Sequence, residues 1–468
     1  MFLTPNRRYV TLAGAVLLLE WTWVFFGSPG QKDILASLPS TQHEVMKDIF
    51  DYGFIQSNAL KDICDSLEWS NELIFTCDDN SGSVADVKNS ILNCLRFTIA
   101  AGGRLVVPRI ITSNTNEITD SPAKQTYFGS MFDLDHFLMS LHLSCPQLNT
   151  YKHVDDIPAK QTYFGSMFDL DHFLMSLHLS CPQLNTYKHV DDIPPRAWMH
   201  EPLSLRPEDV VPPFPPTGIQ SPATWGAEFH SWLNSQTATR VPANGLIVVN
   251  LAHSPPIYPV SSDEGLAHEF GWFLKIQPDA RRLATSTFRA LLDKYNIKAA
   301  DSDAIPENAY VGAYFGPNAA ALDLSVSDTS HQPTTSPQRV LNATITSGID
   351  VLYFASNDPS SSEQLVAAAS SLGIRAATKF DLLQSRDAAA LQALGLEQQR
   401  LVDYLVLGRA SQFMGVGGDA FGWSVALGRG GKWRREEGEG MEGELMRDSL
   451  SRIYGDGRDD EFASCLWP

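Results

Sequence analysis

Short, unbroken apolar runs alternate along the chain with stretches in which apolar residues recur at helical spacing. Residues 84–101 show helical spacing, Gly102 and Gly103 mark a turn, and residues 105–107 form a short apolar run. Spacing of this period predicts an amphipathic helix, and a short apolar run bounded by turn residues predicts a buried strand. Repeated alternation of the two predicts α/β layers with parallel sheets.

The same alternation continues after a proline-rich stretch at 194–222. Further strands are predicted at 246–251, 310–314, 351–355 and 413–416, and further helices at 270–295, 362–371, 388–407 and 423–428. A chain of 468 residues is too long for one small core. The pattern therefore predicts two lobes that join near the proline-rich stretch and leave a cleft between them.

The first 30 residues contain an apolar run, residues 10–26, that follows Arg7 and Arg8. Its length is near the lower limit for a helix that spans a bilayer. The two arginines predict a type II signal anchor with its basic end in the cytoplasm and the rest of the chain in the lumen. A cleaved secretory peptide is the alternative, because Glu20 makes a stable span costlier. Both interpretations deliver the chain to the secretory pathway.

An identical tandem repeat occupies residues 122–157 and 158–193. Solenoids need several diverged units that stack, so two identical copies indicate a recent duplication or an error in the gene model. One copy alone fits the original place in a packed core, and the sequence does not tell which.

The expected segmentation follows from these features. Residues 1–30 form the cytoplasmic tip and anchor, 31–60 a stem, and 61–222 the first Rossmann-like lobe with the repeat and the linker. Residues 223–430 form a second, nucleotide-binding-type lobe, and 431–468 a polar tail.

The formal charge of −19 is spread over the chain without a basic block. A phosphate backbone attracts clustered lysine and arginine, so nucleic acid is excluded as a partner. The sequence Asn342-Ala343-Thr344 is an N-glycosylation motif in a polar stretch.

Six cysteines contain no CxxC pair and no zinc pattern. Cys64 with Cys77 is the expected local bridge, and Cys94 is expected to pair with Cys145 or Cys181. Buried thiols without disulfides are an equal alternative.

The triplet Asp133-Leu134-Asp135, repeated at 169–171, invites a metal site, because divalent cations prefer carboxylate oxygens. A helix-like sequence follows each copy, and aspartate is also a natural N-cap. We favour the cap and expect no metal site.

A glycine-rich turn at 415–421 connects a predicted strand to a predicted helix. Main-chain N–H groups at such a helix start can receive phosphate. Asp419 would repel phosphate there, so the spacing alone favours a tight connection. The chain has no GxSxG elbow and no Walker or kinase motif.

Several ordered segments carry a resemblance to a known family. They are NCLRF with AAGGRLVVPRI, MFDLDHF, SCPQL, FGWFLKIQPDARRLA, YVGA, LVDYLVLGRASQFMGVGG, FGWSVALGR, SRIYG and CLWP. Together they cover nearly everything from Cys64 to Pro468, and they resemble the fungal branch of the GDP-fucose protein O-fucosyltransferase family.

The resemblance implies a GT-B-like fold in which GDP-fucose binds between two Rossmann-like lobes in the Golgi or ER lumen, with no required metal. It implies inverting transfer of fucose to a hydroxyl of a protein or glycan acceptor. The departing GDP gains negative charge, so the site needs a cation and hydrogen-bond donors at the β-phosphate. The family supplies an arginine in a Gly-Ala-His-Leu-Arg strand end, an early Gly-Gly-x-x-Asn loop and a late Ser-Ser-Phe turn.

This chain departs from the family at all three places. Tyr314 stands at the histidine position, Gly316 at the arginine position, Asp86 at the asparagine position and Asp419 at a phosphate-binding hydroxyl. Without the arginine no catalytic residue is assigned, and a relative that binds glycan or protein partners without transfer is the alternative. The donor-binding candidates are Gly82, Asp86, Lys88, Gly312, Gly415, Gly417, Gly418, Asp419 and Phe421.

Overall fold

Asp48–Pro468 form one compact unit of the computed structural model. The structure describes residues 47–77, 80, 82–110, 164–199, 201–206, 225–237, 245–252, 260, 264–298, 305–316, 337–355, 359–417, 419–430, 444–455 and 463–468. The apolar run at 10–26, the first repeat copy and most of the proline-rich stretch lie outside these ranges. Within them, no helix is long and apolar enough to cross a membrane.

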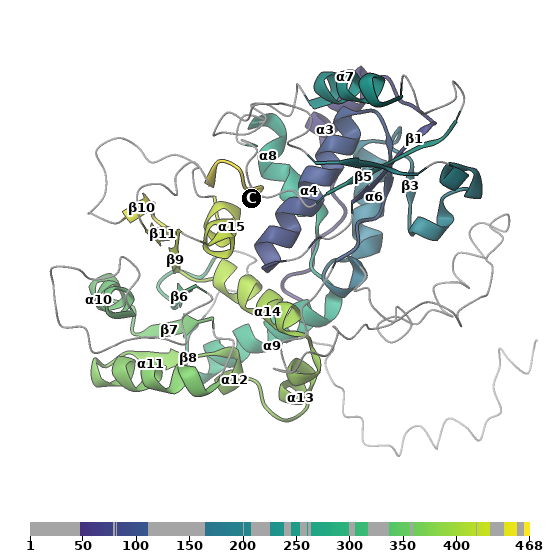
Figure 1. The fold of residues 1–468 in the computed structure, drawn as a ribbon. Coiled ribbons are helices and arrows are strands. Elements are labelled where there is room, and N and C mark those ends of the chain that lie inside the picture. Colours follow the sequence, from purple (N-terminus) through teal and green to yellow (C-terminus); the bar gives the residue numbers. More distant parts are fainter. Residues whose placement is uncertain are drawn as a thin grey trace, which may run out of the picture. The chain divides into compact units, whose positions relative to one another are not determined.

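The first sheet has five parallel strands in the order β3-β2-β1-β5-β4 (Figure 1). They are β1 (Leu73–Cys77), β2 (Arg104–Val106), β3 (Thr186–Tyr187), β4 (Leu203–Leu205) and β5 (Ile247–Leu251). The helices of this part are α3 (Asn58–Ser66), α4 (Val84–Ala100), α6 (Leu170–Ser180), α7 (Trp225–Thr237) and α8 (Glu264–Phe270). Because parallel strands need crossovers, these helices follow the strands and cover the sheet.

Aromatic packing joins β1 to its covering helices. Phe75 of β1, Phe97 of α4 and Phe229 of α7 meet with ring centroids 5.2–6.0 Å apart. Helix α7 approaches α4 closely, because a Cβ at Gly226 would lie 2.2 Å from the main-chain oxygen of Ala100. The contact therefore requires glycine.

The second sheet has six strands in the order β10-β11-β9-β6-β7-β8. They are β6 (Val311–Ala313), β7 (Val351–Phe354), β8 (Arg375–Ala377), β9 (Gln412–Val416), β10 (Glu444–Arg447) and β11 (Ser451–Tyr454). All pairs are parallel except β10 with β11. The helices are α9 (Pro278–Lys294), α10 (Pro337–Ser347), α11 (Pro359–Ser371), α12 (Lys379–Leu382), α13 (Ser385–Ala393), α14 (Leu396–Gly408) and α15 (Ala420–Gly428). The predicted α/β architecture with parallel sheets is thus confirmed.

Helix α14 is fixed to the second sheet by a buried polar cluster. Asp403 of α14 forms an ion pair with Lys379 of α12 and accepts a hydrogen bond of 2.6 Å from the hydroxyl of Tyr353 on β7. Helix α14 also packs along α9, and both helices contribute to one buried apolar cluster that includes α4 (Figure 1). These helices form the region where the candidate site lies.

The second repeat copy supplies core residues of this structure. A 3-10 turn, η2 (Phe164–Ser166), leads to buried Phe168, and α6 buries Phe173 and Leu177. Asp169 caps α6 by accepting a hydrogen bond of 3.0 Å from the main-chain N–H of His172. The cap interpretation of the Asp-Leu-Asp triplet is confirmed for this copy.

Both disulfides differ from the expected pairing. Cys64 of α3 is bonded to Cys181, the C-cap of α6, and Cys77 at the end of β1 is bonded to Cys94 of α4. Cys77 and Cys94 pair because α4 packs back onto the strand that precedes it, which brings their Cα atoms to 6.2 Å. The expected bridges Cys64–Cys77 and Cys94–Cys181 are therefore wrong. Cys145 lies outside the described residues.

The sheets also extend beyond the boundaries expected from the sequence. Strand β5 pairs with β1 and β4 in the first sheet, although it follows residue 222. Residues 444–454 add two strands to the second sheet, and Trp467 is buried. The part of the chain expected as a polar tail thus belongs to the fold, because strand pairing across a long separation is not visible in local polarity.

Candidate functional site

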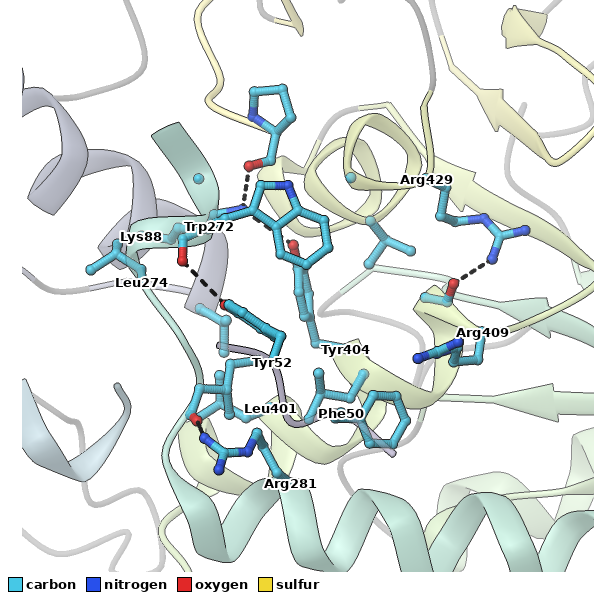
Figure 2. Close-up of a pocket in the computed structure, with 18 of the residues that line it drawn as sticks. Phe50, Tyr52, Lys88, Trp272, Leu274, Arg281, Leu401, Tyr404, Arg409 and Arg429 are labelled. Atoms are coloured by element: carbon cyan, nitrogen blue, oxygen red, sulfur yellow. Dashed lines mark hydrogen bonds between the residues drawn. The ribbon is translucent and has the colours of Figure 1, made fainter. Parts of the chain in front are cut away.

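A cavity of about 510 Å³ lies among α4, α14, α15, the segment 271–276 and the segment 49–52. Figure 2 shows that Lys88, Trp272, Tyr52 and Tyr404 surround it, with Arg409 on another side. Its volume is in the range of small-ligand and cofactor pockets. The walls come from segments far apart in the sequence, so tertiary packing creates the cavity.

Lys88 is a buried cation in one wall. Helix α4 begins with a capping box, in which Ser83 and Asp86 exchange side-chain and main-chain hydrogen bonds. Lys88 follows in the first turns and is 8 % exposed. Its Nζ donates to the main-chain oxygen of Pro468 at 2.6 Å and to the hydroxyl of Tyr404 at 3.4 Å (Figure 2).

Aromatic rings form another part of the lining. Tyr52 and Trp272 contact edge to face, with centroids 5.2 Å apart, and the Tyr52 hydroxyl donates to the Trp272 main-chain oxygen at 3.3 Å. Burial raises the pKa of Tyr52, so its hydroxyl is neutral at physiological pH. The Trp272 side chain is half exposed, which leaves an aromatic surface at the rim of the cavity.

Three arginines line the cavity, and each has protein partners. Arg281 pairs with Asp48 at 2.8 Å and Asp51 at 3.2 Å, which holds the segment 49–52 against α9. Arg429 donates to several main-chain oxygens, and burial lowers its pKa to about 10. Arg409 donates to the main-chain oxygen of Ile49 at 3.0 Å. Arg281 and Arg429 thus have structural roles.

The glycine-rich turn leads into α15, which lines the cavity, and main-chain donors of the turn are bonded within the protein. Asp419 caps α15 by accepting a hydrogen bond of 2.6 Å from the Phe421 N–H, and the Gly417 N–H donates to the Tyr454 main-chain oxygen at 2.7 Å. The ring of Phe421 packs on Tyr314, with centroids 4.5 Å apart. The tight connection favoured by the spacing is confirmed, and two main-chain donors near the start of α15, those of Gly417 and Phe421, are already bonded within the protein.

Carboxylates gather near this helix start. Burial raises the pKa of Asp419 and of Glu397, and the charge of Asp86 raises both further. Arg400 pairs with Glu397 at 2.7 Å and partly offsets this effect. Tyr314 also forms a hydrogen bond with Asp419. This arrangement disfavours an additional anion.

The other predicted donor residues lie apart from the cavity lining. Gly312 packs β6 against α14, because a Cβ there would lie 3.0 Å from the Leu407 side chain of α14 and 2.8 Å from that of Ala410. Gly415 is enclosed by side chains of the second sheet, and Gly82 and Gly316 have φ of +114° and +87° at turns. Gly418 lies outside the described residues. Of the described candidates, Lys88 lines the cavity, and Gly82, Asp86, Gly312, Gly316, Gly415, Gly417, Asp419 and Phe421 do not.

Sequence reasoning missed the rest of the lining. Tyr52 lies in a segment expected as a stem, and Trp272 lies in a short 3-10 turn, η8 (Gly271–Phe273), inside a range expected to be helical. Trp272 lies in the segment FGWFLKIQPDARRLA, in which the resemblance assigned no role to it. Among the described residues, no group of three or more histidine, cysteine, aspartate or glutamate side chains is arranged to hold a metal ion.

Comparisons with known proteins give limited similarity. No family model and no curated protein sequence matches the chain. A crystal structure of POFUT1 in complex with GDP-fucose shares 13% identity at a TM-score of 0.41, covering 83% of this chain and 99% of that one. POFUT1 in complex with GDP shares 11% identity at 0.40, covering 83% and 100%. A mutant of Arabidopsis thaliana FUT1 in complex with GDP shares 12% identity at 0.32, covering 81% and 74%.

Proposed function

We propose that the chain is a fucosyltransferase-like glycosyltransferase that binds GDP-fucose in the cavity beside Lys88. The observation that carries the proposal is this buried lysine in the wall of a ligand-sized cavity with aromatic lining. An ammonium group favours phosphate oxygens, and aromatic rings favour the flat faces of a base or sugar. The ordered sequence segments that resemble O-fucosyltransferases also support it.

In the proposed reaction, an acceptor hydroxyl oxygen bonds to C1 of fucose while the bond from C1 to the β-phosphate oxygen breaks. Attack from the opposite face inverts the configuration at C1. GDP leaves with increased negative charge, which Lys88 stabilises and Arg409 supports from another wall. The hydroxyl proton passes to a base that we do not assign.

Calorimetric titration of the purified full chain with GDP and GDP-fucose tests the proposal. Lys88→Met removes a hydrogen bond to a charged group, which is worth about 1.5–3 kcal/mol, so affinity falls by about ten- to hundredfold. Lys61→Met is the matched control, because Lys61 is an exposed lysine that pairs with Asp65 on α3. The proposal fails if no heat appears at millimolar nucleotide, or if both variants bind like the parent.

A second candidate is a relative that has lost transfer and binds glycan or protein partners. Two observations favour it: Asp419 occupies the N-terminus of α15, and Gly316 stands at the family's arginine position. Asp419→Ser removes a partly buried carboxylate from this helix start and places a neutral hydroxyl there. Under this candidate the parent transfers no fucose, and Asp419→Ser gains nucleotide affinity. Fucose transfer by the parent would eliminate it. Gly316→Arg is a poorer test, because φ is +87° there.

The proposed location is the lumen of the Golgi or ER, behind a type II membrane anchor. Arg7 and Arg8 before the apolar run support it, and so do two disulfides, which persist in oxidising compartments. Asn342, the proposed glycan site, is exposed on α10. A mobility shift of the expressed protein after endoglycosidase treatment, absent in Asn342→Gln, checks this location. An unmodified Asn342 in secretory membranes would contradict the glycan proposal.

A further inference from the structure

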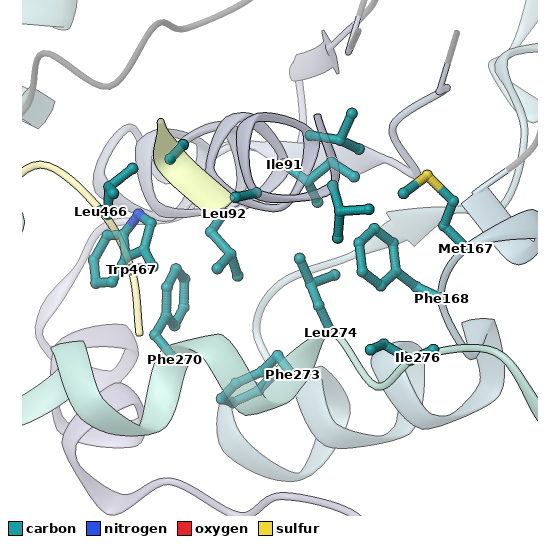
Figure 3. Close-up of a cluster of buried hydrophobic side chains, with 14 of the residues drawn as sticks. Ile91, Leu92, Met167, Phe168, Phe270, Phe273, Leu274, Ile276, Leu466 and Trp467 are labelled. Carbon is teal, nitrogen blue, oxygen red and sulfur yellow. The ribbon is translucent and has the colours of Figure 1, made fainter. Parts of the chain in front are cut away.

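Residues 463–468 form a segment that we call the strap. Figure 3 shows Leu466 and Trp467 of the strap beside α4 and Phe270. The Trp467 ring lies 4.7 Å from the Phe270 ring, its Nε1 donates to the Asn93 side chain at 2.7 Å, and its main-chain N–H donates to Asn89 at 3.1 Å. These contacts fix Trp467 without any help from Lys88.

Pro468 extends from this fixed residue into the cavity. Its main-chain oxygen accepts the 2.6 Å hydrogen bond from Lys88 Nζ, and Pro468 itself lines the cavity. The fit is tight, because a Cβ built at Gly271 would lie 1.7 Å from this oxygen. An oxygen of the protein thus accepts a hydrogen bond from the buried ammonium group.

We propose that the strap is an internal competitor for the anion-binding position at Lys88, with the Pro468 oxygen standing where an oxygen of a diphosphate binds. The choice of a diphosphate as the ligand rests on the proposed function, whereas the covering of Lys88 rests only on the contacts of Trp467 and Pro468. A diphosphate offers the ammonium group several charged oxygens in place of the single Pro468 oxygen that it contacts in this structure. Binding therefore moves Pro468 aside while Trp467 remains in place, and the strap lowers the apparent affinity.

The covering of Lys88 is tested by its rate of acylation with a small amine-reactive reagent, followed by mass spectrometry of the full chain. Trp467→Ala removes the fixed point of the strap, and Trp225→Ala is the matched control, since Trp225 is an equally buried tryptophan of α7. We expect Lys88 to react about tenfold faster in Trp467→Ala and at the parent rate in Trp225→Ala. Equal rates in the parent and Trp467→Ala overturn the proposal.

A steric variant keeps the test valid if Trp467→Ala does not fold. Gly271→Ala forces the Pro468 oxygen away, and its backbone conformation accepts alanine because φ is not in the left-handed region. Gly265→Ala is its control, since the nearest atom to a Cβ there is 4.0 Å away. Faster acylation in Gly271→Ala alone supports the proposal, and equal rates in both variants overturn it.

Titration with inorganic pyrophosphate and with GDP separates this inference from the proposed function. Affinity about fivefold higher in Trp467→Ala than in the parent supports competition. If the parent binds GDP but Lys88 is acylated at the same rate in the parent and in Trp467→Ala, the strap proposal is overturned and the proposed function remains. Faster acylation without GDP binding in any variant supports covering of Lys88 and ends the proposed function.

Discussion

Replacing Lys379 with methionine is expected to destabilise the second sheet and the helix that lines the cavity. The side chains of Lys379 and Asp403 are both 1 % exposed, and they form an ion pair that the Tyr353 hydroxyl joins. Methionine fills similar space but leaves the Asp403 carboxylate buried with one neutral donor. Breaking such a pair costs about 3–5 kcal/mol, because an uncompensated charge stays away from water.

The cost of Lys379→Met depends on pH, and the pKa of Asp403 determines the direction of this dependence. Burial already raises the pKa of Asp403 above its ordinary value, and Lys379 is the largest group acting against this. Without the lysine the pKa of Asp403 rises further, so the folded state takes up a proton more readily than the unfolded chain. The cost of Lys379→Met is therefore absent below the unfolded pKa and complete above the folded pKa.

Urea unfolding of parent and variant, followed between pH 4 and 7, measures both effects. We expect a difference of about 3–5 kcal/mol at pH 7 that shrinks on acidification. Arg375→Met is the control, because Arg375 pairs with Asp350 at 2.8 Å on the surface, where an ion pair contributes about 0–1 kcal/mol. A difference for Lys379→Met below about 1 kcal/mol at pH 7, or one that grows at low pH, would refute the reasoning.

Three further outcomes are expected from the same geometry. Cys181→Ala removes the bridge from α3 to α6 and lowers the free energy of unfolding by about 2–5 kcal/mol, and an unchanged urea midpoint would contradict the bridge. Gly312→Ala places a Cβ 2.8 Å from the Ala410 side chain, so unfolding measurements are expected to show a loss of about 1–3 kcal/mol. Burial raises the pKa of Glu397, so the free energy of unfolding of the parent falls as this carboxylate ionises. The free energy of unfolding of Glu397→Gln is therefore expected to rise relative to that of the parent between pH 4 and 7. A difference between the two proteins that stays constant with pH would argue against this.

Most secondary structure was predictable because local spacing determines it. Helix α4 and strand β9 lie close to their expected ranges, since long periodic stretches and short apolar runs carry strong signals. The range expected as one helix at 388–407 instead forms α13 and α14, with Leu394 and Gly395 between them. Glycine at the N-cap explains the break, because it favours a helix start there.

Pairings over long distances were not predictable in the same way. Cys64 and Cys77 are close in sequence, but Cys64 lies on α3 and Cys77 lies at the end of β1, which faces α4. Strand β5 follows a long connection and still returns to the first sheet. Such pairings depend on how helices and sheets pack in three dimensions, and the local pattern of polar and apolar residues does not determine them.

The site was predictable only in part for the same reason. Lys88 was among the candidates because it lies in a segment that resembles a donor-binding loop, and it lines the cavity. Tyr52 reaches the cavity from a segment expected as a stem, and Tyr404 lies in the segment LVDYLVLGRASQFMGVGG, in which the resemblance assigned no role to it. Asp419 was expected to repel phosphate, and the structure adds that it occupies a main-chain donor of α15.

Diffraction from crystals grown with GDP tests the central claim most directly. The account predicts electron density for the nucleotide in the cavity, with a phosphate oxygen within hydrogen-bond distance of Lys88 Nζ and Pro468 displaced from it. Density for GDP at another place, or a cavity that contains only water at saturating GDP, would contradict the account.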